Sequence, residues 1–176
     1  MAEPPDLSIV LELSRAHAPA DPYAFAFEPQ AYTLRTEGGG RLVLEIDWGP
    51  ALLADLEAVR RPDRDPAVVQ RLGEALARFL ERASWPMRGR AIAEAHEAGR
   101  RVLVTIRSNA AELYALPWEL LAVPGGGQPL GGLPRVLLRY ERPETRTVAE
   151  SPSPRPEGGR ILLAWSAAAG SVPAAE

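Results

Sequence analysis

The sequence predicts an α/β fold, and three patterns support that prediction. Near the N-terminus, apolar and polar side chains alternate over several short segments, as they do in half-buried strands. Over residues 50–99, apolar residues recur at the spacing of amphipathic helices. After Gly99 the chain returns to short runs of consecutive apolar residues, which are typical of strands buried on both faces. At 176 residues and 46% hydrophobic content, the chain can bury one good core.

The alternating N-terminal segments predict an antiparallel meander. In the last of them, Leu42, Leu44 and Ile46 share one face. The glycine-rich connector between Thr36 and Arg41 predicts a hairpin loop, because glycine accepts the positive φ that other residues avoid. The expected strands cover residues 7–14, 23–29, 31–36 and 41–48.

Two helices are expected to follow the meander. In the first, over residues 50–59, apolar side chains fall at helical spacing. The second, over residues 65–83, begins with Asp65 as the capping carboxylate and Pro66 at the first helical position, where its missing N–H costs nothing. Its expected apolar stripe consists of Val69, Leu72, Leu76, Phe79 and Leu80.

A third helix is expected over residues 84–99, with Ser84 as its cap and Gly99 as its end. Met87, Ile92 and Ala95 would lie on one side of it. Three strands of the doubly buried kind then follow, over residues 100–106, 134–141 and 159–166. Residues 143–159 are rich in Pro, Ser and Glu and lack periodicity, which predicts a linker or mobile loop.

The composition excludes several classes of function. The chain has no Cys, so it has no disulfide, thiolate metal site or cysteine nucleophile, and it has no Lys for a Schiff base or a Gly-Lys-Ser/Thr phosphate loop. A formal net charge of -3 argues against nucleic-acid binding. No apolar run approaches the roughly 18 residues of a membrane helix, and the N-terminus lacks the blocks of a signal peptide. We therefore expect a cytoplasmic protein without a membrane partner.

No residue pattern predicts a catalytic, cofactor or metal site. His17 and His96 are the only histidines, and both are expected at the surface. Asp63 and Asp65 lack the glycine and glutamate that would complete a calcium loop. Residues 125–132 are glycine-rich, but without a following helix and Lys they predict a hairpin turn rather than a phosphate cradle. The arginine-rich run at residues 60–64 predicts a solvated loop.

The order of segments in the second half resembles the CHAT family of caspase-like cysteine peptidases. The strand at residues 102–106 is followed by Glu-Leu-Tyr-Ala-Leu-Pro-Trp-Glu-Leu-Leu at residues 112–121, a glycine-rich hairpin, the strand at 135–141, a polar spacer and the strand at 160–166. In that family Leu-Pro-Trp-Glu is a structural hallmark. We expect Pro117 to open a short helix and Trp118 to be buried with Leu116 and Leu121, while Leu120 adds apolar surface. Glu119 would cap or pair with a nearby Arg.

The resemblance implies a cysteine peptidase whose His and Cys lie on strands after residues 160–166. Residues 1–142 would be the N-terminal α/β region, and residues 160–176 would contain the first, incomplete strand of the caspase-like sheet. We therefore expect this chain to be inactive and to scaffold a catalytic half beyond residue 176. Self-association through the unpartnered strand is a further expectation. The alternative is a catalytically inactive interaction domain that binds a partner through a sheet edge.

Overall fold

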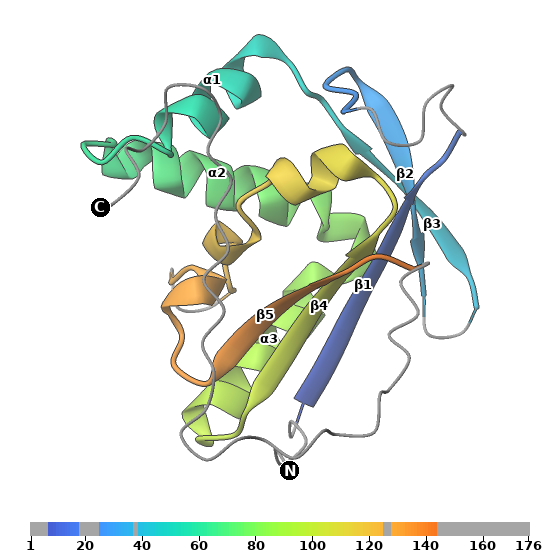
Figure 1. Ribbon diagram of the computed structural model, residues 1–176. Coiled ribbons are helices and arrows are strands. Elements are labelled where there is room, and N and C mark those ends of the chain that lie inside the picture. The colour runs from blue at the N-terminus through green and yellow to red at the C-terminus, as the bar shows by residue number, and fades with distance from the viewer. Residues whose placement is uncertain (1–6, 18–24, 37–38, 125–127, 144–176) are drawn as a thin grey trace, which may run out of the picture. The chain divides into compact units, whose positions relative to one another are not determined.

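One five-stranded sheet forms the centre of the structure, a computed structural model that describes residues 7–17, 25–36, 39–124 and 128–143. These residues all belong to the first of the two units into which the chain divides, Met1–Thr145. The strands are β1 (Leu7–Arg15), β2 (Gln30–Arg35), β3 (Arg41–Ile46), β4 (Val102–Ser108) and β5 (Val136–Glu141). Their order across the sheet is β3-β2-β1-β4-β5 (Figure 1).

The sheet is mixed, and the length of each connection explains the direction of each pair. The strands β1, β2 and β3 form the predicted antiparallel meander, and Gly39, at φ 77°, lies in the hairpin between β2 and β3. The strand β4 pairs parallel with β1, and β5 pairs parallel with β4. Parallel neighbours require a long crossover, which the helical segment supplies before β4 and residues 109–135 supply before β5.

The three predicted helices are present, and local sequence explains their ends. They are α1 (Pro50–Ala58), α2 (Pro66–Phe79) and α3 (Trp85–Glu97). The Asp65 side chain accepts a hydrogen bond from the Ala67 N–H at 2.9 Å, which confirms it as the cap of α2. Gly99, at φ 68°, follows the end of α3 and terminates it, with the Arg100 N–H bonded to the Ala95 carbonyl at 2.9 Å. Short 3₁₀ turns cover Glu81–Ala83, Ala111–Ala115, Trp118–Leu120 and Leu130–Gly132.

The core lies between the helices and one face of the sheet, which we call the helix-covered face. Alternate residues of the central strands supply it, among them Leu11 and Leu13 of β1 and Val104 and Ile106 of β4. All three helices lie on this side of the sheet (Figure 1), and their apolar side chains join the same core. The other face of the sheet, called the second face here, carries the alternate side chains. No described helix lies on it.

Four predictions about individual segments are wrong. The described part of the strand predicted at residues 23–29 is not extended in the sheet, because both sides of β1 and of β2 are already occupied by other strands. In α2, Val68 rather than Val69 is buried. In α3, Met87 is 70% exposed, and Ser84 makes no side-chain capping bond because it adopts a left-handed conformation. Ile92 and Ala95 are buried as predicted.

The strand β5 also differs from its prediction, because it is not buried on both faces. It is an edge strand of the described sheet, and Leu137 on the second face is 63% exposed. The predicted linker after Pro143 and the predicted strand at residues 160–166 lie outside the described residues. Of the helices in the described part of the chain, none has the length and apolarity that a membrane crossing requires.

Candidate functional site

The Leu-Pro-Trp-Glu-Leu-Leu segment lies at the join between the helices and the sheet. Trp118 is fully buried, and Leu116 and Leu121 are 2% and 0% exposed, as predicted. A 3₁₀ turn over Trp118–Leu120 follows Pro117, which confirms the expected short helical element. Glu119 is exposed, and it makes no ion pair with any described arginine. The segment therefore contributes mainly packing.

Close backbone contact fixes this segment against α2. The Trp118 Nε1–H donates to the Leu113 carbonyl at 2.7 Å, and the Trp118 ring lies 6.3 Å from that of Phe79, centroid to centroid. A Cβ added at Gly73 of α2 would lie 2.5 Å from the Leu120 carbonyl oxygen. Glycine is therefore required at position 73, because only its missing side chain allows the two backbones to approach so closely.

A buried polar cluster joins β1, β2 and the turn that precedes Pro117. Arg15 forms a two-pronged ion pair with Glu112, with Nε donating to Oε1 at 2.9 Å and Nη2 donating to Oε2. The Tyr32 hydroxyl donates to Glu112 Oε1 at 2.9 Å, and it accepts from Trp48 Nε1 at 3.1 Å. The side chains of Arg15 and Glu112 are 5% and 0% exposed. Every carboxylate oxygen of Glu112 thus has a donor.

The pKa values in this cluster show that Glu112 is held in its charged form. Burial by itself would raise the pKa of Glu112, but hydrogen bonds from Arg15, from its own backbone and from Tyr32 lower that pKa below its ordinary value. Burial raises the pKa of Tyr32, and the adjacent Glu112 carboxylate raises it further, while the bond from Trp48 opposes the shift. A satisfied, charged carboxylate without a neighbouring nucleophile has a structural role.

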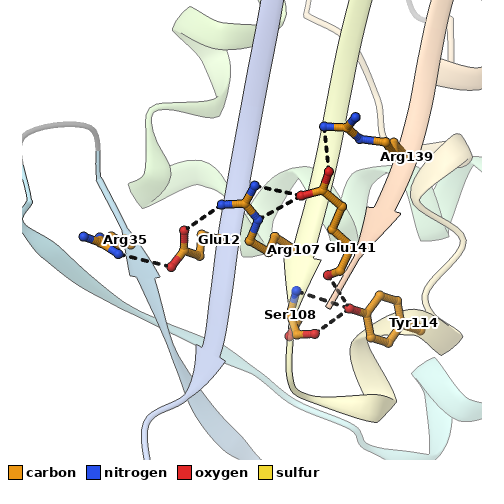
Figure 2. A network of polar contacts seen from close by, with 7 residues as sticks. All are labelled: Glu12, Arg35, Arg107, Ser108, Tyr114, Arg139 and Glu141. Carbon is orange, nitrogen blue, oxygen red and sulfur yellow. Dashed lines mark hydrogen bonds and ion pairs between the residues drawn. The ribbon is translucent and has the colours of Figure 1, made fainter. Parts of the chain in front are cut away.

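A row of alternating charges crosses the second face of the sheet, as Figure 2 shows. Arg35, Glu12, Arg107 and Glu141 are direct register partners on β2, β1, β4 and β5. Arg107 contacts Glu141 at 2.7 Å and Glu12 at 3.4 Å, and Arg35 contacts Glu12 at 3.5 Å. Arg139 joins the row through Glu141 at 2.7 Å. The hydrogen bond to Glu141 raises the pKa of Arg107.

Tyr114 connects this row to the end of β4. Its hydroxyl donates to the Glu141 carbonyl at 2.7 Å and also contacts the backbone of Ser108 (Figure 2). On the helix-covered face, its ring lies 5.9 Å from that of Tyr140, centroid to centroid. The segment before Pro117 is thereby fixed to the C-terminal ends of the two parallel strands.

The edge of β5 presents unpaired backbone groups among the described residues. The Val102 N–H donates to the Arg135 carbonyl at 3.0 Å, so the backbone groups of Arg135 point toward β4. Because the backbone groups of successive residues in a parallel ladder point alternately to the two sides, those of Leu138 and Tyr140 point away from β4. Such an edge is a template for another strand.

A groove of about 530 Å³ lies beside the C-terminal half of β5, and we call it the β5 groove. Its floor is apolar, and Leu56 and Leu116 there are 6% and 2% exposed. Its walls come from the end of α1 and the turn after it, from the Leu-Pro-Trp-Glu segment, and from β5. The residues of these walls include Val59, Arg60, Arg64, Tyr114, Glu119 and Tyr140.

The residues considered as possible catalytic or metal-binding groups are not brought together. His17 is exposed, and His96 Nδ1 donates to the Pro134 carbonyl at 3.1 Å. Asp65 caps α2, and Asp63 is exposed in the preceding turn. Within the part of the chain that the structure describes, no three His, Asp or Glu side chains form a metal-binding group. Around the glycine-rich stretch, Ala122 and Pro129 form an antiparallel bridge, consistent with the predicted hairpin.

Sequence reasoning missed the buried cluster and the charged row. One signal for the cluster was present, because Arg15 is in phase with Ile9, Leu11 and Leu13 and so had to lie on the buried face. Its partner was not predictable, since Glu112 lies 97 positions away.

Comparison of the chain with known protein families, with curated proteins and with solved structures finds no match in any of the three.

Proposed function

We propose that this chain is a non-catalytic scaffold that receives a further strand along the edge of β5, and that this strand belongs to the catalytic part of a CHAT-type caspase-like peptidase. One observation carries the proposal. The strand β5 is parallel to β4, is an edge strand of the described sheet, and leaves Leu137 63% and Tyr140 44% exposed. An edge with exposed apolar side chains favours association with another strand.

The resemblance in residues 102–166 supports the choice of partner. The Leu-Pro-Trp-Glu segment packs against the core and is anchored to β4 through Tyr114, so it braces the strand pair from which the sheet would extend. The second candidate function is an interaction domain that binds an unrelated protein through the same edge. The same exposed strand favours this second function, which requires no peptidase partner.

The test combines an activity assay, a complex-formation assay and a variant of the β5 edge. Incubated with a broad peptide library, the purified chain is expected to give no cleavage above the buffer control. Cleavage that survives repurification and is lost in His17→Ala or His96→Ala would overturn the proposal. The chain is then co-expressed with the polypeptide segment, encoded in the same or an adjacent reading frame, that carries a His-Gly pair and a later Cys. A one-to-one complex, measured by light scattering, is expected.

Leu138→Pro tests whether the complex forms along β5, and Leu138→Ala is its matched control. Proline removes the Leu138 N–H, which points away from β4, whereas alanine shortens the same side chain and keeps the N–H. We expect proline alone to abolish the complex. A complex that survives Leu138→Pro would contradict edge pairing. If no segment with His and Cys is encoded there but Leu138→Pro abolishes binding to another protein, the second candidate function is supported instead.

A further inference from the structure

The β5 groove adjoins the strand edge at the place where an added strand would present its side chains. A new strand lies about 4.8 Å beyond its neighbour, and alternate side chains point to the two faces of the sheet. Tyr140 belongs to β5, faces the helix-covered side and lines the groove. A side chain placed next to Tyr140 on the same face would therefore enter the groove.

The groove has the chemistry of a pocket for a large apolar side chain. Leu56 and Leu116 form a buried floor, and Val59 adds a further apolar side chain. The rings of Tyr114 and Tyr140 flank it, with centroids 5.9 Å apart. The Tyr114 hydroxyl already contacts the backbone of Ser108 and Glu141, so its ring face is the part offered to a ligand. An apolar floor surrounded by polar groups that fix a ligand's orientation is typical of ligand-binding pockets.

The charges at the groove favour an acidic group. Arg60 and Arg64 line it, both are exposed, and neither forms an ion pair with another described residue. Arg61, between them, differs because it pairs with Glu57 at 3.1 Å. Glu119 is the one acidic side chain among the lining residues, so the groove has an excess of positive charge. Two arginines can bind one carboxylate through several charge-assisted hydrogen bonds.

From this arrangement we infer that the β5 groove selects the strand that pairs with β5, by accepting a large apolar side chain and, two residues from it, a carboxylate. The spacing of two follows because residues i and i+2 of a strand lie on the same face. This inference rests on the proposed function, since it requires strand addition at β5. It concerns which strand is accepted, whereas the proposed function concerns whether one is accepted.

Labelled octapeptides of the type Thr-Val-Thr-Phe-Thr-Glu-Thr-Val, made in this order and with Phe and Glu exchanged, are suitable probes. Binding to the full chain is measured by fluorescence anisotropy. We expect one of the two orders to bind, and replacement of Glu by Gln or of Phe by Ser to weaken it by about tenfold or more. The double variant Arg60→Gln/Arg64→Gln is expected to lose the preference for Glu over Gln. Arg61→Gln is the matched control and should keep it.

The remaining outcomes separate this inference from the proposed function. If Leu138→Pro abolishes peptide binding but peptides with Phe or Glu bind no better than those with Ser or Gln, the inference is overturned. Edge pairing at β5 would then remain supported. Binding that depends on Arg60 and Arg64 but survives Leu138→Pro would overturn the inference, because the peptide would then occupy the groove without pairing along β5. Displacement of the Glu peptide by millimolar inorganic phosphate, with tighter binding of a phosphothreonine peptide, would show that the arginines select phosphate and would overturn the carboxylate assignment. If no peptide binds, the inference is wrong, and the complex-formation test decides the proposed function separately.

Discussion

At the scale of single residues, the buried ion pair Arg15–Glu112 is expected to have a large effect on stability. Two charges that are almost fully removed from water are tolerated because each is neutralised and hydrogen-bonded by the other. The net free energy that the pair contributes to folding is small compared with the desolvation penalty of burying either charge alone. Tyr32 and Trp48 complete the cluster, so its four members come from segments that are distant in the sequence.

We predict that Glu112→Gln destabilises the protein by roughly 3 kcal/mol, because it removes the buried carboxylate charge to which Arg15 donates two hydrogen bonds. Glu12→Gln, in the partly exposed row on the second face, is the control and should cost less than about 1 kcal/mol. Urea unfolding of the three proteins at neutral pH measures both values. Equal losses in the two variants would show that Glu112 is not buried with Arg15.

The stabilisation that the Arg15–Glu112 pair contributes should decrease as the pH falls. Because the pKa of Glu112 is lower in the folded than in the unfolded protein, its ionised form stabilises the fold above the ordinary glutamate pKa. That stabilisation is lost as the pH falls through the folded-state pKa. The difference in unfolding free energy between the wild type and Glu112→Gln should therefore narrow as the pH is lowered from about 7 into the range below about 4. A difference that widened in acid would contradict the assigned pKa direction.

At the scale of elements, the Leu-Pro-Trp-Glu-Leu-Leu segment acts as a bracket between α2 and the sheet. We predict that Trp118→Ala destabilises the protein by about 3 to 5 kcal/mol, because it opens a cavity and leaves the Leu113 carbonyl without its donor. Trp118→Phe keeps most of the ring volume and should cost less. Denaturant unfolding followed by circular dichroism measures both. A folded Trp118→Ala protein with unchanged stability would exclude the bracing role.

The contact of α2 with this segment predicts an unusual response to a glycine substitution. In a helix interior, Gly→Ala normally stabilises by about 1 kcal/mol. At Gly73 the new Cβ would overlap the Leu120 carbonyl, so we expect Gly73→Ala to destabilise by roughly 2 kcal/mol instead. Glu74→Ala, one position along on the exposed side, should stay within about 0.5 kcal/mol of the wild type. A more stable Gly73→Ala protein would show that the two backbones are not in contact.

At the scale of the whole molecule, local patterns predicted the elements better than their arrangement. The cap and proline at Asp65 and Pro66, and the alternation in residues 41–48, identified α2 and β3 because these signals act over a few residues. Alternation at residues 23–29 failed to predict a strand, since a strand also needs a free neighbour and the adjacent strands β1 and β2 are already paired on both sides. The parallel pairing of β1 with β4 was not predictable, because it joins residues about 95 positions apart, as Glu12 and Arg107 are.

The candidate site divides in the same way. The burial of Leu116, Trp118 and Leu121 followed from a short motif. The β5 groove combines Arg60, Leu116 and Tyr140 from three separate segments, and no local pattern relates them. The run at residues 60–64 is solvated as predicted. Its position beside β5 emerges only from the tertiary fold.

The charged row joins four of the five strands, so its disturbance should affect the whole sheet. We predict that Arg107→Glu destabilises the protein by roughly 2 kcal/mol at low ionic strength, because it places three acidic side chains in one row. Arg107→Gln should cost about 1 kcal/mol or less. Thermal unfolding at low salt and in about 1 M NaCl distinguishes the two effects, because salt screens the repulsion in the glutamate variant. If the loss of stability in Arg107→Glu were the same at both salt concentrations, its cause would not be electrostatic.

The same row provides the sheet with a check on alignment that apolar side chains alone cannot provide. A strand that slips by one residue exposes its apolar side chains, and burial rejects the error. A slip of two residues keeps every side chain on its own face and would escape that selection. In this sheet it would set Val10 or Ser14 opposite Arg107 in place of Glu12 and remove the charge contact. The ionic row thus favours the native register over registers shifted by two residues, and so it helps to align β1 with β4 during folding.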